Sequence, residues 1–233
     1  MAIAAGHRKI TFVSSMCDIF ESDKTFKGKW LDHTKQPIDT TFDEQRAKAF
    51  SAIDTMPEIH FLLLTKRPQN ILNSVPDNPH PIGGKHVKYR DNVSYGTSAG
   101  TQKTWDSKVK QLMRLKDTLS PSLFVSCEPM LEPVDIQRND FGWQPDVIFC
   151  GGESAGRDKV RPMDLRWSLD LRDQCLAIER GPMFHFKQLG SYAILDGAPL
   201  RYKHPKGEDP KEWPRRFGLS ANQSVPEHWR AKL

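Results

Sequence analysis

The feature that most constrains the fold is an alternation of short apolar runs with amphipathic stretches along the chain. Six runs are typical of strands, because they are short, rich in branched and aromatic side chains, and bounded by turn residues. They begin near residues 9, 60, 92, 122, 146 and 182. Three of the intervals between them place apolar residues at helical spacing. This alternation predicts a parallel sheet with right-handed crossovers.

The clearest helix signal follows residue 40. Thr41 and Glu44 form a capping box, after which Phe50 and Ile53 continue an apolar face. A second helix is predicted before Ser120, and a third after Asp164, which can cap its first turn.

Every predicted strand becomes polar where it ends. The groups concerned are Ser14, Ser15 and Asp18; Thr65, Lys66 and Arg67; Thr97 and Ser98; Cys127 and Glu128; Gly151, Gly152 and Glu153; and Lys187 and Gln188. In an open doubly wound sheet ligand groups gather at one switch point, whereas all the strand ends of a barrel surround one mouth. We therefore expect an α/β fold with a parallel βα barrel, TIM-like or partial, of about six βα units, and a site at its mouth.

The loop after the strand at 146–150 is the strongest candidate for a ligand loop. Gly151 and Gly152 would let backbone amides face a ligand without a side chain in the way, and Glu153 offers an anionic acceptor. An ordinary tight turn between strand and helix would use the same glycines, so both interpretations stay open. The sequence contains neither a complete P-loop nor a G-x-G-x-x-G, and we do not expect a nucleoside triphosphatase.

Charged groups at a barrel mouth are candidates for acid, base or ligand-binding roles, because neighbouring charges shift their pKa values. The candidate catalytic residues are Glu128, Glu153, Asp18 and Lys66. The candidate ligand-binding residues are Ser14, Ser15, Thr65, Arg67, Thr97, Gly151, Gly152, Ser154, Arg161, Lys187 and Gln188. Arg67 and Arg161 could grip a carboxylate or phosphate bidentately. The alternative for each charged residue is a salt bridge within the mouth.

The four cysteines give no metal-binding pattern. Cys17, Cys127, Cys150 and Cys175 are far apart in the sequence, and no C-x-x-C occurs. We therefore predict no metal site of the usual spacing, and expect small buried side chains at these positions.

The chain of 233 residues is long enough for one large domain, with a net charge of +5 and a pI near 9.0. It has no apolar run approaching the roughly 20 residues that span a bilayer, and no secretory signal, so we expect a cytoplasmic protein without membrane contact. We assign residues 1–190 to the barrel. Residues 191–233 are a basic tail with five prolines and two tryptophans, which we expect to pack on the barrel without regular structure.

Seven sequence blocks resemble the signature blocks of the phage gp thirty-seven / gp sixty-eight family, and they run in family order. They are residues 12–20, 63–68, 124–131, 150–154, 161–163, 171–175 and 184–190. That family occurs in phages and bacteria and is similar to radical-SAM enzymes. The resemblance implies a βα barrel whose N-terminal cysteine motif holds an iron–sulfur cluster that reacts with S-adenosylmethionine.

The chain departs from the family at the cysteine motif. The resemblance begins at the strand that should follow it, so we expect the cluster ligands to be missing here, and either supplied by a separate polypeptide or lost. The leading hypothesis is a phage-type protein derived from a radical-SAM-like enzyme, which binds a small anionic or nucleoside-containing ligand at the strand ends. The alternative is a non-catalytic nucleic-acid-binding or partner protein that uses the basic, tryptophan-bearing tail.

Overall fold

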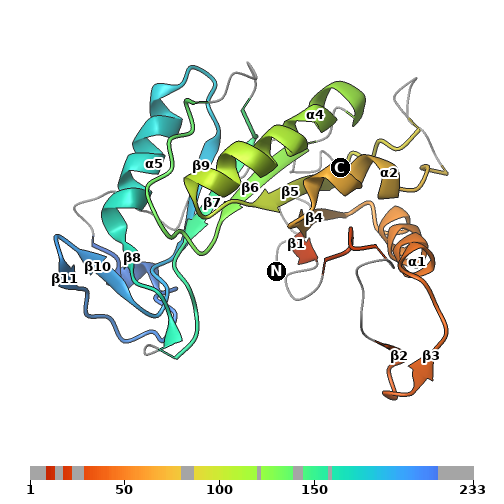
Figure 1. Cartoon of the computed structure of the whole chain (residues 1–233), viewed down its shortest axis with the longest axis horizontal. Coiled ribbons are helices and arrows are strands. Elements are labelled where there is room, and N and C mark those ends of the chain that lie inside the picture. Colours follow the sequence, from red (N-terminus) through yellow and green to blue (C-terminus); the bar gives the residue numbers. More distant parts are fainter. Residues whose placement is uncertain are drawn as a thin grey trace.

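The computed structural model of the chain (Figure 1) describes residues 9–13, 18–22, 29–79, 87–119, 122–138, 144–156 and 159–214. Six strands form one parallel sheet, in which the order of the strands is their order in the chain. They are β1 (Lys9–Val13), β4 (Ile59–Thr65), β5 (Val93–Ser98), β6 (Ser122–Cys127), β7 (Val147–Gly151) and β9 (Met183–Gln188). The sheet curls into a half-barrel, so the predicted parallel βα barrel is confirmed in its partial form.

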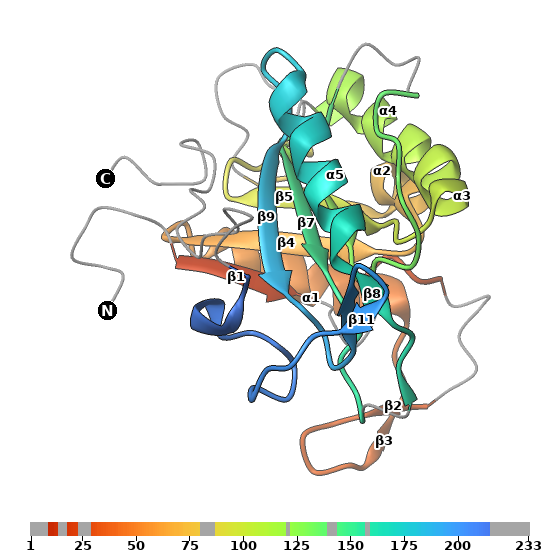
Figure 2. The ribbon, with the colours of Figure 1, turned by 90° about the vertical axis from the view of Figure 1, so that its left-hand side faces the viewer.

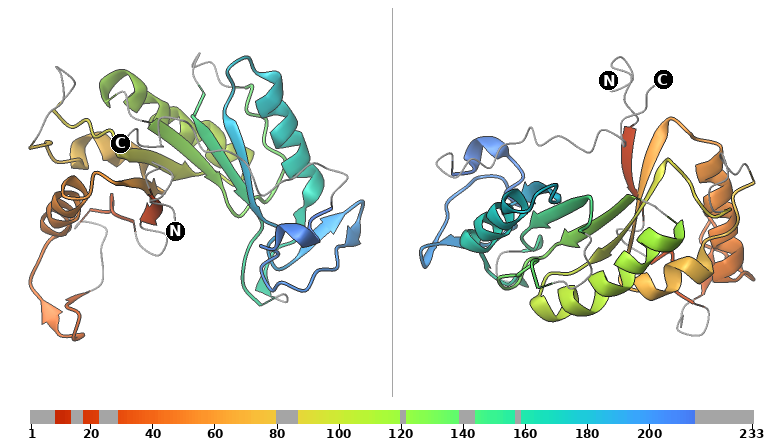
Figure 3. Two further views of the ribbon diagram at one scale, coloured as in Figure 1. Left: turned by 180° about the vertical axis from the view of Figure 1, so that it is seen from behind. Right: turned by 90° about the horizontal axis from the view of Figure 1, so that it is seen from above.

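Helices fill most of the crossovers and lie along the outside of the curve (Figures 2 and 3). They are α1 (Phe42–Asp54), η2 (Pro68–Asn70), α2 (Ile71–Ser74), α3 (Gln102–Thr104), the π-helical turn η3 (Trp105–Val109), α4 (Lys110–Leu119) and α5 (Leu165–Ala177). The predicted capping box of Thr41 and Glu44 is present at the start of α1, and Asp164 caps α5. Between β6 and β7, the described residues 128–138 and 144–146 contain no helix.

The main core lies between the sheet and the helices. Alternate strand residues supply one side of it and helix residues the other, as expected for a parallel sheet covered by crossovers. At most 1% of each of the following residues is exposed: Leu63, Tyr95, Val125 and Ile148 from the strands, and Phe50, Ile71, Leu112 and Leu171 from the helices.

A smaller apolar cluster fills the concave side of the sheet. Leu62, Phe124, Val147 and Phe149 are buried there. The ring of Phe12, on β1, lies edge-on to Phe124 and Phe149 with centroids 5.8 and 5.1 Å away. The first strand of the sheet therefore contacts the fourth and fifth strands through side chains alone.

The segment after residue 190 corrects one expectation, because it contains short strands. β10 (Ala193–Leu195) pairs in parallel with β8 (Met163–Asp164) and antiparallel with β11 (Ala198–Pro199), and a 3-10 turn, η5 (Pro210–Glu212), follows. Pattern reasoning missed strands of two and three residues, which are too short to show periodicity.

The tail as far as residue 214 packs on the end of β9. Trp213 is 4% exposed, its ring lies 4.9 Å from that of Phe186, and its indole N–H donates to the carbonyl of Gly207 at 2.9 Å. The boundary at residue 190 remains a prediction.

A small hairpin, β2 (Trp30–Leu31) and β3 (Pro37–Ile38), projects from the body below α1 (Figures 1 and 2). The side chain of Asp32 accepts hydrogen bonds from the amides of Thr34 and Gln36 and thereby shapes its turn. Among the described residues, no helix combines the length and the apolar character that a bilayer crossing needs.

Candidate functional site

Because all six strands of the sheet are parallel, their C-terminal ends share one edge, and the predicted site residues lie along it. The residues that the structure describes form separate groups along this edge. Ser14, Ser15 and Cys17 lie outside the described residues.

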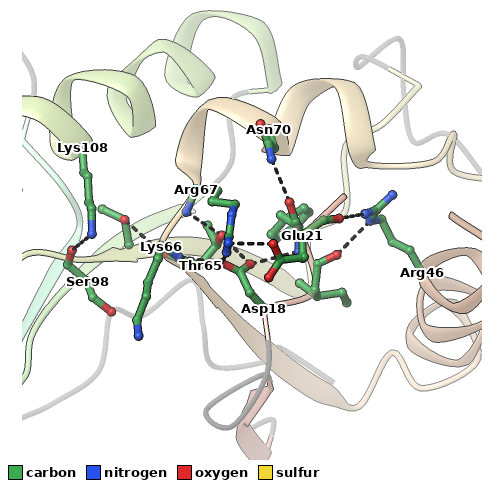
Figure 4. Close-up of polar contacts among 12 residues, drawn as sticks. Asp18, Glu21, Arg46, Thr65, Lys66, Arg67, Asn70, Ser98 and Lys108 are labelled. Carbon is green, nitrogen blue, oxygen red and sulfur yellow. Dashed lines mark hydrogen bonds and ion pairs between the residues drawn. The ribbon is translucent and has the colours of Figure 1, made fainter. Parts of the chain in front are cut away.

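The first group is a clamp made of Asp18, Glu21, Thr65 and Arg67 (Figure 4). The carboxylate of Asp18 accepts from the hydroxyl of Thr65 at 2.6 Å, the amide of Lys66 at 3.0 Å and the guanidinium of Arg67 at 3.0 Å. The other end of that guanidinium lies 2.6 Å from Glu21 Oε1. Both Asp18 and Arg67 are thus engaged in intramolecular ion pairs.

The clamp holds the segment 18–22 against the sheet. Arg46, on α1, donates to the carbonyls of Ile19 and Glu21 at 2.9 and 2.7 Å. The side-chain amide of Asn70 donates to the backbone carbonyl of Phe20 at 2.9 Å. Phe20 itself is fully buried. These contacts give the clamp a structural role.

A lysine pair, Lys66 and Lys108, lies beside the clamp. Lys66 follows β4 directly, is exposed, and its ammonium group has no partner in the described part of the chain (Figure 4). Lys108 Nζ lies 3.3 Å from the carbonyl oxygen of Ser98, at the end of β5. Burial lowers the pKa of Lys108, and the nearby charge of Lys66 lowers it further. Sequence reasoning missed Lys108 because it belongs to a helical turn and not to a strand end.

Glu128 and Lys187 form the third group. Glu128 Oε2 accepts from the hydroxyl of Ser126 at 3.1 Å, and Lys187 Nζ lies 3.3 Å from Oε1. Only 14% of the Glu128 side chain is exposed. Burial raises the pKa of this carboxyl, against the opposing effect of Lys187.

Gly151 makes this pairing sterically possible. β7 lies between β6, which leads to Glu128, and β9, which carries Lys187. A Cβ atom at position 151 would lie 2.8 Å from Glu128 Oε1. Glycine therefore leaves room for the two side chains to meet across the intervening strand.

Three further predicted site residues, Gly152, Ser154 and Gln188, form a turn whose groups bond one another. The amide of Gly152 donates to the carbonyl of Gln188 at 3.1 Å, and a Cβ there would lie 2.3 Å from the carbonyl oxygen of Leu189. The amide group of Gln188 donates in return to the carbonyl of Gly152 and to the hydroxyl of Ser154. Of the two interpretations of this loop, these contacts favour the tight turn.

Glu153 and Arg161 form a bidentate ion pair, with N–O distances of 3.0 and 2.8 Å. The hydrogen bonds from Arg161 lower the pKa of Glu153 to about 2. Glu153 is therefore a stable anion, and its charge already has a partner. The hydroxyl of Thr97 is also engaged, since it donates to the carbonyl of Thr65 at 2.9 Å.

The three described cysteines do not suit an iron–sulfur cluster. Cys127, Cys150 and Cys175 are at most 4% exposed in the main core, which confirms the expectation of small buried side chains. Burial raises the pKa of Cys150 and of Cys175 to about 12, and that of Cys127 well above its ordinary value. Cluster ligands are thiolates, and burial in the apolar core opposes the ionisation of these thiols. Within the described residues, no group of three histidine, cysteine or acidic side chains could hold a metal ion.

Three comparisons with known proteins complete the description. The model of a family described as "Protein of unknown function (DUF5131)" matches residues 2–212, a range that includes the strands β10 and β11 and the turn η5. Neither the curated proteins nor the solved structures gave a match.

Proposed function

Since the chain belongs to the DUF5131 family, whose description states no activity, we propose a function from the geometry of the strand ends. The half-barrel binds a small anionic ligand through Lys66 and Lys108, and Glu128 exchanges a proton with that ligand. The observation that supports this proposal is the contrast between the arginines and the lysines of the edge.

The two arginines predicted to grip a ligand have carboxylate partners of their own. Arg67 pairs with Asp18 and Glu21, and Arg161 pairs with Glu153. Neither ammonium group of the lysine pair forms an ion pair with a described carboxylate. Neighbouring positive charges that lack counter-charges, next to low-dielectric walls, attract anions.

The register of the sheet brings the lysine pair and Glu128 within reach of one ligand. Thr65 pairs with Thr97, and Ser98 with Ser126, so Lys66, Ser98 and Ser126 lie at nearly the same level on three neighbouring strands. With strands about 5 Å apart, a ligand about 10 Å long would extend from Lys66 to the Ser126 hydroxyl that donates to Glu128.

Glu128 is suited to proton transfer because its raised pKa brings it closer to neutrality than an ordinary glutamate. Lys187 lowers the cost of ionisation when the proton leaves. The pair can therefore hold the carboxyl in either state as a ligand changes its charge.

The resemblance to radical-SAM enzymes extends the proposal to nucleoside-containing ligands. S-adenosylmethionine carries a carboxylate that the lysine pair would bind. The described cysteines do not fit a cluster, so we derive no radical step from them, and a separate polypeptide carrying the cysteine motif remains a prediction.

The test is calorimetric titration with inorganic pyrophosphate. We expect Lys66→Ala and Lys108→Ala each to weaken binding by about 10-fold or more, since a charge-assisted hydrogen bond contributes about 1.5–3 kcal/mol. Lys48→Ala, an exposed lysine on α1, is the control and should bind as the wild type does. Equal affinity in all four proteins would refute the proposal.

Nucleic-acid binding by the tail has weaker support. Lys203, Lys206 and Lys211 are exposed, but Lys206 lies 3.9 Å from Glu208, and Trp213 is buried and cannot stack on a base. Deleting residues 191–233 would remove this core tryptophan. A deletion of 215–233, followed by measurement of how RNA binding depends on salt, therefore tests this alternative more directly.

A further inference from the structure

We infer that Lys108 is also a nucleophile, which forms an imine with a carbonyl compound carrying a carboxylate or phosphate group. This inference rests on the proposed function, because the anionic group would be held at the lysine pair. It narrows the ligand class to anionic aldehydes and ketones.

The first support is the way the amine is positioned. Lys108 belongs to the π-helical turn η3, whose residues Trp105 and Val109 are fully buried and anchor the turn beside the end of β5. Single π turns inside helices occur frequently at functional sites. The Lys108 amine reaches the strand ends, where the hydrogen bond to the Ser98 carbonyl, at 3.3 Å, is long. An amine with one weak contact is available to a ligand.

The second support is the charge around this amine. Besides Lys66, the charged groups that act on Lys108 are Asp18 and Arg67, and these two are paired with each other. Partial burial and a neighbouring cation both favour the neutral amine, as in lysines that form imines in enzymes.

The reaction balances without an oxidant or reductant. The neutral nitrogen of Lys108 attacks the carbonyl carbon, the C–N bond forms, and a proton passes from nitrogen to the carbonyl oxygen. The resulting hydroxyl leaves as water after it takes a second proton from the solvent. The products are the protonated imine of Lys108 and one molecule of water.

The experiment uses pyridoxal 5′-phosphate, an aldehyde with a phosphate group, on the full chain. The imine is reduced with sodium cyanoborohydride, and the labelled lysines are identified by peptide mass spectrometry. We expect Lys108 to be labelled at least about 10-fold faster than Lys48, and inorganic pyrophosphate to slow this labelling. Labelling of Lys108 should also begin at lower pH than labelling of Lys48.

The variant Lys108→Arg tests whether the fast adduct depends on the amine of Lys108. Arginine keeps the positive charge but forms no imine under these conditions, so this variant should lose the fast adduct. Thermal unfolding followed by circular dichroism confirms that the variant is folded. If Lys108 in the wild type is labelled no faster than Lys48, or if Lys66 is labelled first, the inference is overturned. Pyrophosphate binding that depends on both lysines would still support the proposed function in that case.

Discussion

At the scale of single residues, the glycine that ends β7 and the two glycines of the loop after it have different roles. Gly151 leaves space for Glu128 to meet Lys187, and Gly152 lets the loop approach the backbone of Leu189. At Gly156 a Cβ would meet no described atom within 4 Å. The three glycines look alike in the sequence, and only the structure shows that their surroundings differ.

Alanine at each position should therefore have a different effect. Gly152→Ala would place a Cβ 2.3 Å from a backbone oxygen that cannot move alone, and we expect it to lower the free energy of unfolding by about 1–3 kcal/mol. In Gly151→Ala, the new Cβ would lie against the carboxylate of Glu128, which can move. The main effect should therefore be displacement of that carboxylate. Gly156→Ala should stay within about 0.5 kcal/mol of the wild type. Urea unfolding measures all three, and equal losses at 152 and 156 would contradict this assignment.

The ion pair of Glu153 and Arg161 predicts a defined pH dependence. The pKa of Glu153 falls from its usual 4.5 to about 2 in the folded chain. A carboxyl with a lowered folded pKa stabilises the fold above its unfolded pKa, and this stability is lost as the pH falls. The contribution should be below about 1 kcal/mol because the pair is largely exposed. Glu153→Gln should thus be less stable than the wild type at pH 6, and the two should converge near pH 2. A difference that stays constant over this range would exclude the ionic origin.

At the scale of elements, the clamp attaches the segment after β1 to the end of β4. Asp18 accepts hydrogen bonds from three consecutive residues, Thr65, Lys66 and Arg67. It therefore fixes the backbone at Lys66 as well as its own segment. The Asp18 carboxylate should therefore affect both the stability of the fold and the binding of a ligand by Lys66.

We expect Asp18→Asn to destabilise the fold by about 1–3 kcal/mol, because it removes the charge that faces Arg67 and replaces one of the two accepting oxygens by an NH2 group. It should also weaken pyrophosphate binding when that NH2 group takes the place of Oδ2, since it cannot accept from the backbone amide of Lys66. Glu21→Gln, which removes only the outer partner of Arg67, should have a smaller effect on both unfolding and calorimetric titration. A loss of stability with unchanged pyrophosphate affinity would show that the clamp does not position Lys66.

The sequence predicts these elements unevenly, and the reasons are physical. All six strands of the half-barrel are foreseen because each is a short run with branched or aromatic side chains, although β1 contains no buried residue. The helix α1 is foreseen from its capping box. The hairpin β2–β3 and the strands β8, β10 and β11 are missed because strands of two or three residues carry no periodicity.

The site is predicted less well than the fold. Strand ends are visible in the sequence, but the partner of each charge is not, so the salt bridges of Arg67 and Arg161 could only be named as an alternative to ligand binding. Lys108 lies ten residues beyond Ser98, and only the turn of its helix brings it back to that carbonyl.

At the scale of the whole molecule, the half-barrel leaves β1 and β9 as the two edges of its sheet. Phe12 joins the first edge to the middle of the concave face through ring contacts with Phe124 and Phe149. The side chain of Phe12 is 39% exposed, so its contacts with the two rings are partly open to solvent. Parallel sheets are usually covered on both faces, and the concave face depends on this ring.

We expect Phe12→Ala to lower the free energy of unfolding by about 1–3 kcal/mol, less than the 3–5 kcal/mol typical of a fully buried phenylalanine. Leu31→Ala, in the projecting hairpin, is the control. Because Leu31 is 52% exposed, this substitution should lower the free energy of unfolding only slightly. Urea unfolding of the two variants makes the comparison. If both change stability equally, the ring contacts of Phe12 do not hold the curl.

The order of the strands also bears on how the chain folds during its synthesis. Each strand of the sheet is hydrogen-bonded to the one made just before it, so every strand finds its neighbour already outside the ribosome. The sheet can therefore grow one strand at a time from the N-terminus, with one crossover connection to close at each addition. The ring of Phe12 must wait for β7, and the indole of Trp213 meets Phe186 only after β9 is complete. The lysine pair and the clamp belong to the early part, and their edge of the half-barrel is assembled before the carboxyl of Glu128 meets Lys187.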